Sequence, residues 1–230
     1  RYITALSPSD DSEKIHSKNE PVVLTKSIKS ALTYRAVTTE SEYEQVLKLR
    51  YLAYSAHGKV KQGSTWKEQG EGLRNEGTLI AGFLGSKMIC TAELRFKDGT
   101  IPFRLSKYVE NVEKLAAISD KTVEINKLAL HPKAQGSDLI VGIMQKIHGI
   151  LVTKGGYDVL IAATDKLAPL YFRIGFKKSG LECPHPYLAD QKLNVLILPK
   201  HLYLQARQIN PVAWVAVYEN TQRYLESVGV

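Results

Sequence analysis

Apolar positions change their spacing along the chain, and each change predicts a secondary-structure element. From Val123 to Leu130 they alternate loosely with polar positions and stop at His131 and Pro132, which is typical of a strand leaving a sheet. A short polar turn follows, and apolar residues then recur at helical spacing at Ile140, Ile143, Met144, Ile147 and Leu151. This order predicts a strand, a short turn and a helix.

Similar patterns precede this unit. Residues 32–37 alternate as a first strand, and Thr39 and Glu42 have capping-box spacing at the start of a helix. Residues 78–84 and 88–96 predict a hairpin around the turn at 85–86. One face of the helix is formed by Tyr43, Val46, Leu47, Arg50, Tyr51 and Tyr54. Residues 57–77 read as a long glycine-rich loop whose Trp66 either covers a substrate pocket or pins the loop to the core.

Further elements are expected after the central unit. Residues 159–163 and 193–198 are apolar enough for buried strands, and residues 109–118 before the unit are helix-like. Residues 180–187 contain two prolines and predict a loop. A closing helix is expected from Asn210 and Pro211. Its apolar face would comprise Trp214, Val217, Tyr218, Thr221, Tyr224 and Leu225.

Composition is that of a soluble globular protein, with 44% hydrophobic and 23% charged residues in a chain of 230. No apolar run is long enough to cross a bilayer, and the first residues contain no signal-peptide core. The polar stretch 1–30 predicts a flexible arm, and residues 31–230 predict one domain with a helical extension from about residue 199. Two cysteines form no disulfide framework, so we expect a reducing cytoplasm.

The formal net charge of +8 favours an acidic partner. An anionic membrane and an acidic carrier protein both fit. Nucleic acid fits least, because the basic residues are scattered and no aromatic RNA-binding motif is present. Cys183 and His185 lie two positions apart, but no second pair completes a metal site, so we expect no metal.

The turn before the central helix is a candidate anion site. A helix N-terminus offers free backbone N–H groups, Gly136 allows close approach, and Ser137 is a plausible N-cap. The alternative is an ordinary capped helix. Further along, Thr164 and Asp165 follow a strand, and a short helix leads to Leu170-Tyr171 and, three residues later, Gly175-Phe176.

This succession of strand, phosphate-type loop, long helix, strand and short helix resembles the core of the GNAT superfamily of N-acetyltransferases, over roughly residues 32–198. The resemblance implies an α/β (α+β) fold with a central mixed, mostly antiparallel sheet flanked by helices. It also implies that the backbone of Leu128, Ala129 and Leu130 holds a pantetheine arm. The residues facing its phosphate would be Lys133, Gln135, Gly136 and Ser137.

The same resemblance suggests two catalytic residues. Glu124 is the candidate general base, because it precedes the pantetheine-binding residues on the same strand and burial would raise its pKa. The alternative is a strand glutamate that faces solvent. Tyr171 matches the tyrosine that protonates the departing thiolate, and the alternative is a packed tyrosine.

One departure from the loop pattern of the superfamily bears on which acyl donor the protein uses. Asp138 stands where the pattern has a small residue and would repel the pyrophosphate of coenzyme A. The prosthetic arm of acyl carrier protein carries a single phosphodiester, and the basic balance suits that protein. We therefore expect the acyl-phosphopantetheine of acyl carrier protein as donor, with no covalently bound cofactor. Acyl-coenzyme A is the alternative donor.

A branch of the superfamily is also suggested. This chain is similar to the acyl-homoserine-lactone synthases and the long-chain N-acyl amino acid synthases at Arg50, Tyr54, Trp66, residues 91–95 and Glu124. Glu68, Glu71 and Asn75 replace the aspartate cluster of the lactone synthases, which favours the amino acid synthases.

We therefore expect a bacterial N-acyltransferase that moves a long-chain acyl group to the amine of an amino acid. Arg95 would clamp the acceptor carboxylate, unless it pairs with Glu93 or another acid, and Tyr54 and Trp66 would line the substrate site. A coenzyme A-dependent N-acetyltransferase and a non-catalytic acyl-binding regulatory module remain the alternatives.

Overall fold

The structure, a computed structural model, describes residues 32–110, 112, 119–134, 137–185, 191–205 and 210–219, without the side chains of 137, 138 and 205. The expected arm over residues 1–30 lies outside this part of the chain, as does most of the helix expected over 109–118.

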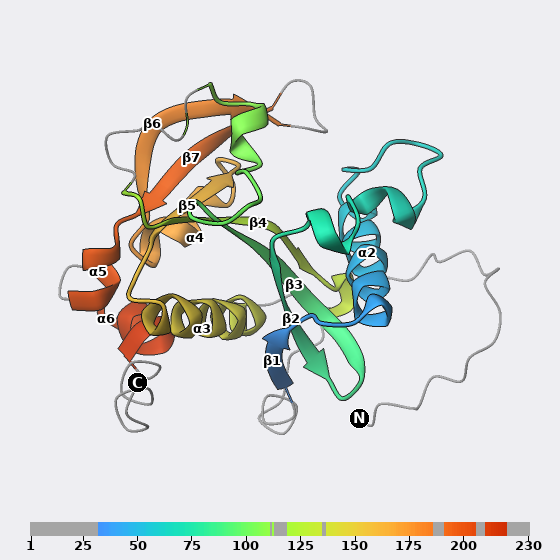
Figure 1. The fold of residues 1–230 in the computed structure, drawn as a ribbon, viewed down its shortest axis with the longest axis horizontal. Helices are drawn as coiled ribbons and strands as arrows, with labels where there is room; N and C mark the ends of the chain where they lie inside the picture. Colours follow the sequence, from blue (N-terminus) through green and yellow to red (C-terminus); the bar gives the residue numbers. More distant parts are fainter. Residues whose placement is uncertain are drawn as a thin grey trace.

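Within these residues, seven strands form one sheet in the order β1-β2-β3-β4-β5-β7-β6 (Figure 1). All neighbouring strands are antiparallel except β4 and β5, which run parallel. The expected mixed, mostly antiparallel sheet flanked by helices is confirmed. The strands are β1 (Leu32–Ala36), β2 (Thr78–Leu84), β3 (Lys87–Phe96), β4 (Thr122–Leu130), β5 (Asp158–Ala163), β6 (Lys177–Pro184) and β7 (Lys192–Leu198).

The helices connect and cover these strands. The α-helices are α2 (Glu40–Ser55), α3 (Ser137–Thr153), α4 (Ala168–Arg173), α5 (Lys200–Gln205) and α6 (Pro211–Ala213). The short 3-10 turns are η1 (Trp66–Gln69), η2 (Leu73–Asn75), η3 (Leu105–Lys107) and η5 (Pro132–Ala134), and η6 (Trp214–Glu219) is a π-helix. As the capping-box spacing predicts, the Thr39 side chain accepts the Glu42 N–H and begins α2.

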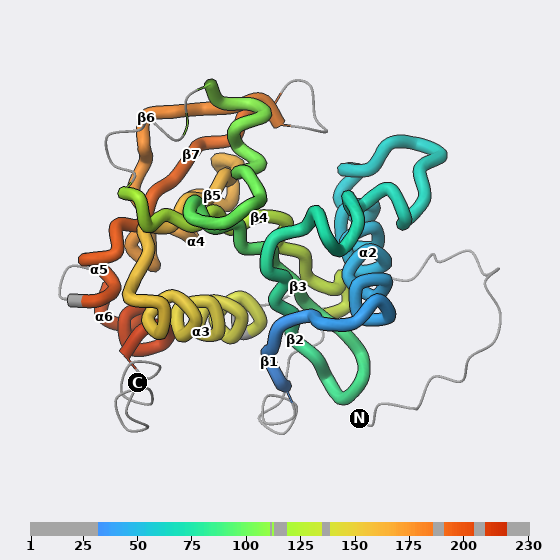
Figure 2. The backbone as a smooth tube through the Cα atoms, in the orientation of Figure 1, coloured from blue at the N-terminus to red at the C-terminus, as the bar shows by residue number. Residues whose placement is uncertain are grey.

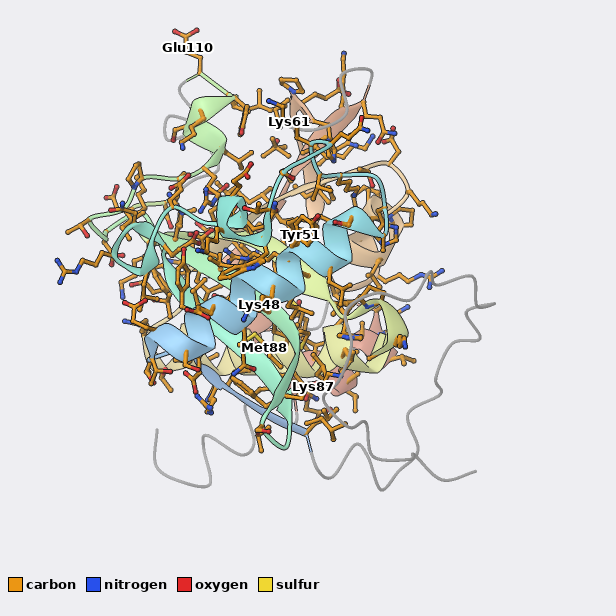
Figure 3. The ribbon with its side chains drawn as sticks, turned by 90° about the vertical axis from the view of Figure 1, so that its right-hand side faces the viewer. Lys48, Tyr51, Lys61, Lys87, Met88 and Glu110 are labelled. Atoms are coloured by element: carbon orange, nitrogen blue, oxygen red, sulfur yellow. The ribbon has the colours of Figure 1, made fainter. Side chains whose placement is uncertain are left out.

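The two long helices cover opposite faces of the sheet (Figures 1 and 2). On β2, Leu79 and Ala81 pack with the buried face of α2, whereas Ile80 packs in the cluster that contains the apolar stripe of α3. Successive side chains of a strand point to opposite faces, so this alternation separates the two helices. Figure 3 looks onto the α2 face and shows that helix in front of the sheet.

Residues 103–109, between β3 and β4, pack on the same face as α2. Phe103 and Leu105 pack with Leu160 of β5, whereas the neighbouring Val159 and Ile161 belong to the cluster of α3. This packing brings residues 103–107 over the parallel pair β4 and β5. The backbone of this segment therefore lies next to the strand that carries Glu124.

The loop expected over residues 180–187 is wrong in its first part, because the chain up to Pro184 belongs to β6. Among the described residues this strand lies at the edge of the sheet and pairs only with β7, and an edge strand tolerates proline. Its register shifts between Lys178 and Glu182, where Gly180 has a φ of 88°. The glycine and proline therefore mark an irregular edge strand rather than a loop. Residues 186–190 lie outside the described part.

The remaining predicted elements match the structure where it describes them. The hairpin is formed by β2 and β3, and the strand-turn-helix unit by β4, η5 and α3. Asn210 caps the closing helix by accepting the N–H groups of Val212 and Ala213, and the helix continues as η6. Its predicted face positions Thr221, Tyr224 and Leu225 lie outside the described residues.

Candidate active site

A cleft opens where the parallel strands β4 and β5 separate. They pair only over Thr122–Ile125 and Asp158–Ile161, although both continue further. Two cavities lie beyond this point: the Glu124 cavity, of about 360 Å³, and the Leu130 cavity, of about 840 Å³. The residues lining both are Tyr54, Lys59, Leu128, Thr164, Leu167 and Tyr171. The cavities therefore adjoin each other.

The open edge of β4 faces this cleft. Ala129 and Leu130 pair with Thr91 and Cys90 of β3 on one side. On the other side, the pairing of β4 with β5 has already ended at Ile125. The edge can therefore accept an extended chain as a further strand would. Leu128 lines both cavities, and Ala129 and Leu130 line the Leu130 cavity.

A β-bulge interrupts β4 at the wall of the Glu124 cavity. Thr91 and Glu93 of β3 face Ala129 and Asn126 of β4, so the β4 strand carries one extra residue. Lys127 has a φ of 47°, which is unusual for a residue with a side chain. A bulge leaves backbone groups without ladder partners, and an unpaired N–H beside a reaction site can bind an oxyanion.

Glu124 lines this cavity and is buried, with 1% of its surface exposed. Its carboxylate accepts the backbone N–H groups of Arg104 at 2.6 Å and of Leu105 at 3.1 Å. Burial raises the pKa of Glu124 to about 7, against the opposing effect of the neighbouring donors. The alternative of a solvent-facing glutamate is wrong. A carboxyl group with a pKa near neutrality can accept and return protons under ordinary conditions.

Tyr171 lies in α4 and lines both cavities. Burial raises the pKa of its phenol to about 12, and its ring packs edge-on against Phe176 at a centroid distance of 5.6 Å. It is therefore both a packed tyrosine and a residue of the cleft wall. A phenol with so high a pKa keeps its proton and acts as a hydrogen-bond donor.

The structure describes only part of the predicted phosphate loop. Lys133 lies in η5 and is exposed, and Ser137 begins α3. Gln135 and Gly136 lie outside the described residues, as do the side chains of Ser137 and Asp138.

Arg95, the expected carboxylate clamp, donates its hydrogen bonds to other groups of the protein. It is 3% exposed and does not belong to the residues lining either cavity. Its Nε donates to Glu93 at 2.8 Å, its Nη1 to the Pro102 carbonyl at 2.8 Å, and its Nη2 to the Asn75 carbonyl at 3.2 Å. The pairing with Glu93 that the sequence left open is the arrangement found here.

A second arginine, Arg104, was not identified from the sequence and lines the Glu124 cavity. Its guanidinium bridges three carboxylates, with Nε 2.6 Å from Glu93, Nη1 2.9 Å from Glu71 and Nη2 3.3 Å from Glu76. Its backbone N–H holds Glu124. One residue therefore connects the acidic cluster to the buried carboxyl group.

Glu76 joins two more cations to this cluster. Its side chain pairs with Arg50 at 3.3 Å in a pair with no exposed surface, and with Lys127 at 2.9 Å. Burial lowers the pKa of Lys127 to about 8, while Glu76 acts in the opposite direction. The acids and bases of this network come from α2, from loops and from strands far apart in the sequence, so no local pattern indicates it.

The two aromatic residues expected near substrate lie in different places. Tyr54, near the end of α2, lines both cavities. Trp66 lies outside both and packs against the α2 cluster, with Lys48 Nζ 4.9 Å from its ring centroid. This is the arrangement in which the tryptophan pins the loop to the core.

Two negative observations concern only the described residues. Among them, no three His, Cys, Asp or Glu side chains are grouped in a way that could hold a metal ion. No helix in this part of the chain has the length and hydropathy needed to cross a bilayer.

Comparison with known proteins identifies a family that the sequence matches. The sequence matches the family described as N-acyl amino acid synthase FeeM over residues 45–198. No curated protein matches the sequence.

Solved structures show the same fold. The structure of FeeM, an N-acyl amino acid synthase from uncultured soil microbes, matches with a TM-score of 0.59 at 15% identity, over 84% of this chain and 97% of that chain. The AHL synthase LasI matches with a TM-score of 0.54 at 12% identity, over 74% and 93%. The ribosomal-protein-S18-alanine N-acetyltransferase from Escherichia coli matches with a TM-score of 0.51 at 12% identity, over 74% and 94%.

Proposed function

Because the chain belongs to the N-acyl amino acid synthase FeeM family, we propose that it transfers a long-chain fatty acyl group from acyl carrier protein to the amine of an amino acid. Family membership makes the protein an N-acyltransferase. The carrier, the chain length, the acceptor and the roles of individual residues are our proposal.

The observation that carries the proposal is the position of Glu124. A buried carboxyl group with a pKa near 7 lines a cavity that adjoins the open edge of β4. Acyl transfer to an amine needs a base at the nitrogen and a thioester held within reach of it. Glu124 supplies the base and the edge of Leu128, Ala129 and Leu130 supplies the place for the thioester arm.

The reaction then follows from this arrangement. The acceptor amine enters the Glu124 cavity, its nitrogen attacks the thioester carbonyl carbon, and Glu124 accepts a proton from that nitrogen. A backbone N–H at the β4 bulge binds the oxyanion of the tetrahedral intermediate. The carbon–sulfur bond breaks, Tyr171 donates a hydrogen bond to the departing thiolate, and the sulfur finally takes the proton that left the amine.

Charge supports acyl carrier protein as the donor. The chain carries a net charge of +8. The exposed Lys166 lines the Leu130 cavity, and the exposed Lys133 follows Leu130 by three residues in η5. Such a surface attracts an acidic protein. The two unpaired, buried cysteines support a reducing compartment such as the bacterial cytoplasm.

The decisive experiment is mass spectrometry of products from purified protein. One mixture contains long-chain acyl carrier protein and the common amino acids, and a parallel mixture contains acetyl-coenzyme A in place of the carrier. We expect an N-acyl amino acid only in the first mixture. Product only in the second would replace the proposal by a coenzyme A-dependent acetyltransferase, and absence of product from both would favour an acyl-binding module.

A further inference from the structure

An amino acid acceptor brings a carboxylate close to the reacting atoms. The amine and the carboxylate are attached to the same carbon. The carboxylate carbon therefore lies two bonds from the nitrogen that attacks the thioester. A cation that binds it must therefore lie where the donor and acceptor spaces meet. In this structure that place is the junction of the Glu124 cavity and the Leu130 cavity.

Lys59 is the lysine at this junction, because it lines both cavities together with Leu128 and Tyr171. Its position follows from the end of α2. Gly58 adopts a left-handed φ of 66°, and the Lys59 N–H returns to the carbonyl oxygen of Tyr54 at 2.9 Å. This turn ends the helix and places the half-buried Lys59 in the wall of the cleft.

The other cations of the Glu124 cavity are already neutralised. Arg104 and Lys107 contact Glu71 at 2.9 and 3.2 Å, and Lys127 contacts Glu76 at 2.9 Å. For Lys59, no carboxylate among the described residues lies within 4.0 Å of Nζ.

His185 lines the same cavity and adds no charge at neutral pH. Burial lowers its pKa, and the positive charge of Lys59 lowers it further. Within the described wall of the Glu124 cavity, Lys59 is thus the cation available to an anionic ligand.

We propose that the ammonium group of Lys59 binds the α-carboxylate of the acceptor, which makes the enzyme selective for free amino acids over amines and amino acid amides. This inference rests on the proposed function. The phosphodiester of the donor is the other anion near the site. It lies at the opposite end of the pantetheine arm from the thioester, whereas Lys59 lines both cavities together with Leu128 and Tyr171, where we place the thioester.

The test compares acceptors in wild-type protein and in Lys59→Met. Hexadecanoyl acyl carrier protein is the donor, and the amino acid that the wild-type protein acylates from a mixture of the common ones is supplied as free acid and as carboxamide. We expect the KM for the free acid to rise about 10- to 100-fold in Lys59→Met, as for the loss of one charged hydrogen bond. The KM for the carboxamide and for the donor should stay unchanged, so the preference for the free acid disappears.

Two variants complete the experiment. Lys61→Met is the matched control, because Lys61 belongs to the same loop, is exposed and does not line either cavity (Figure 3). It should keep the wild-type preference. Lys59→Arg should recover most of it, since the guanidinium also pairs with a carboxylate.

Three outcomes would overturn the inference. They are an unchanged preference for the free acid in Lys59→Met, a rise in donor KM alone, and a wild-type protein that acylates amide and acid equally well. Each of them leaves the acyl transfer itself intact. Absence of any N-acyl amino acid from the wild-type protein would instead overturn the proposed function, and with it the acceptor to which the inference refers.

Discussion

Replacement of Glu124 by glutamine tests both the reaction and the physical origin of the base. The two side chains have the same shape, but glutamine accepts no proton. General bases typically contribute about 10²- to 10⁴-fold to rate, so Glu124→Gln should lower kcat/KM by that order. Because the base must be unprotonated to act, the wild-type kcat/KM should rise with pH through about 7, where Glu124 titrates. This limb should be missing in the variant.

The same substitution has a calculable effect on stability. Glu124 is an acid whose pKa is higher in the folded protein, at about 7, than the ordinary value of 4.5. Folded protein therefore binds this proton more tightly than unfolded protein, and its stability falls as pH rises between the two values. Each pKa unit corresponds to about 1.4 kcal/mol, so the ionised carboxylate costs the fold on the order of 3 kcal/mol above pH 7.

Glutamine removes this cost but gives up one accepted hydrogen bond, because its amide nitrogen cannot accept the N–H of Arg104 or Leu105. Glutamine does not titrate, so this loss adds no pH dependence of its own. The informative quantity is therefore the change with pH of the difference in unfolding free energy between Glu124→Gln and wild type. We expect the difference to move by about 3 kcal/mol in favour of the variant between pH 4 and pH 8.

Urea denaturation at several pH values measures the stability, and amine-dependent release of free thiol from acyl carrier protein measures the rate. If the difference in unfolding free energy stays constant from pH 4 to pH 8, burial does not raise the pKa of the Glu124 carboxyl group to near neutrality. Wild-type turnover in Glu124→Gln would remove this residue as the base, whatever the stability data show.

Three further predictions follow, two for the site and one for the packing of α3 against β1. Arg104→Met should release the segment whose N–H groups hold Glu124, which raises the pKa of that carboxyl group and moves the rising limb of kcat/KM to higher pH. Lys107→Met removes a contact with the same acidic cluster but no link to Glu124, so it should leave the limb in place. Tyr171→Phe should lower kcat about tenfold or more without shifting that limb, as measured by the same thiol assay; an unchanged kcat would make Tyr171 a packing residue. Gly142→Ala should destabilise the fold by about 1–3 kcal/mol in urea titrations, because the added methyl group would overlap the Tyr34 ring, and Tyr34→Leu in the same chain should restore part of the loss.

The parts of the fold that depend on local spacing could be predicted from the sequence. The alternation before His131 and the helical stripe after it gave β4 and α3, since both patterns report which face of an element is buried. The edge strand β6 could not be predicted in this way. Its bulge at Gly180 and its end at Pro184 carry the same residues as a loop, and only pairing with β7 distinguishes the two.

The residues of the candidate site also differ in whether a local sequence pattern indicates them. Glu124 and Tyr171 were identified because they occur within local motifs. Arg104 lies 20 residues from Glu124 and 33 from Glu71 in the sequence, and only the packing of residues 103–107 over β4 brings them together. Arg95 was the more obvious candidate because it stands in a strand beside Glu93, and that same proximity is what occupies its donors.

The pairing of these charges also bears on the proposed role of Glu124 as a base near neutral pH. An unpaired arginine or lysine beside a carboxylate would lower the pKa of the carboxyl and weaken it as a base. Here Glu71, Glu76 and Glu93 pair with the cations around the cavity, so burial remains the largest influence on Glu124. The acids of the network therefore keep Glu124 basic, and they leave Lys59, at the junction of the two cavities, as the positive charge that an incoming carboxylate meets.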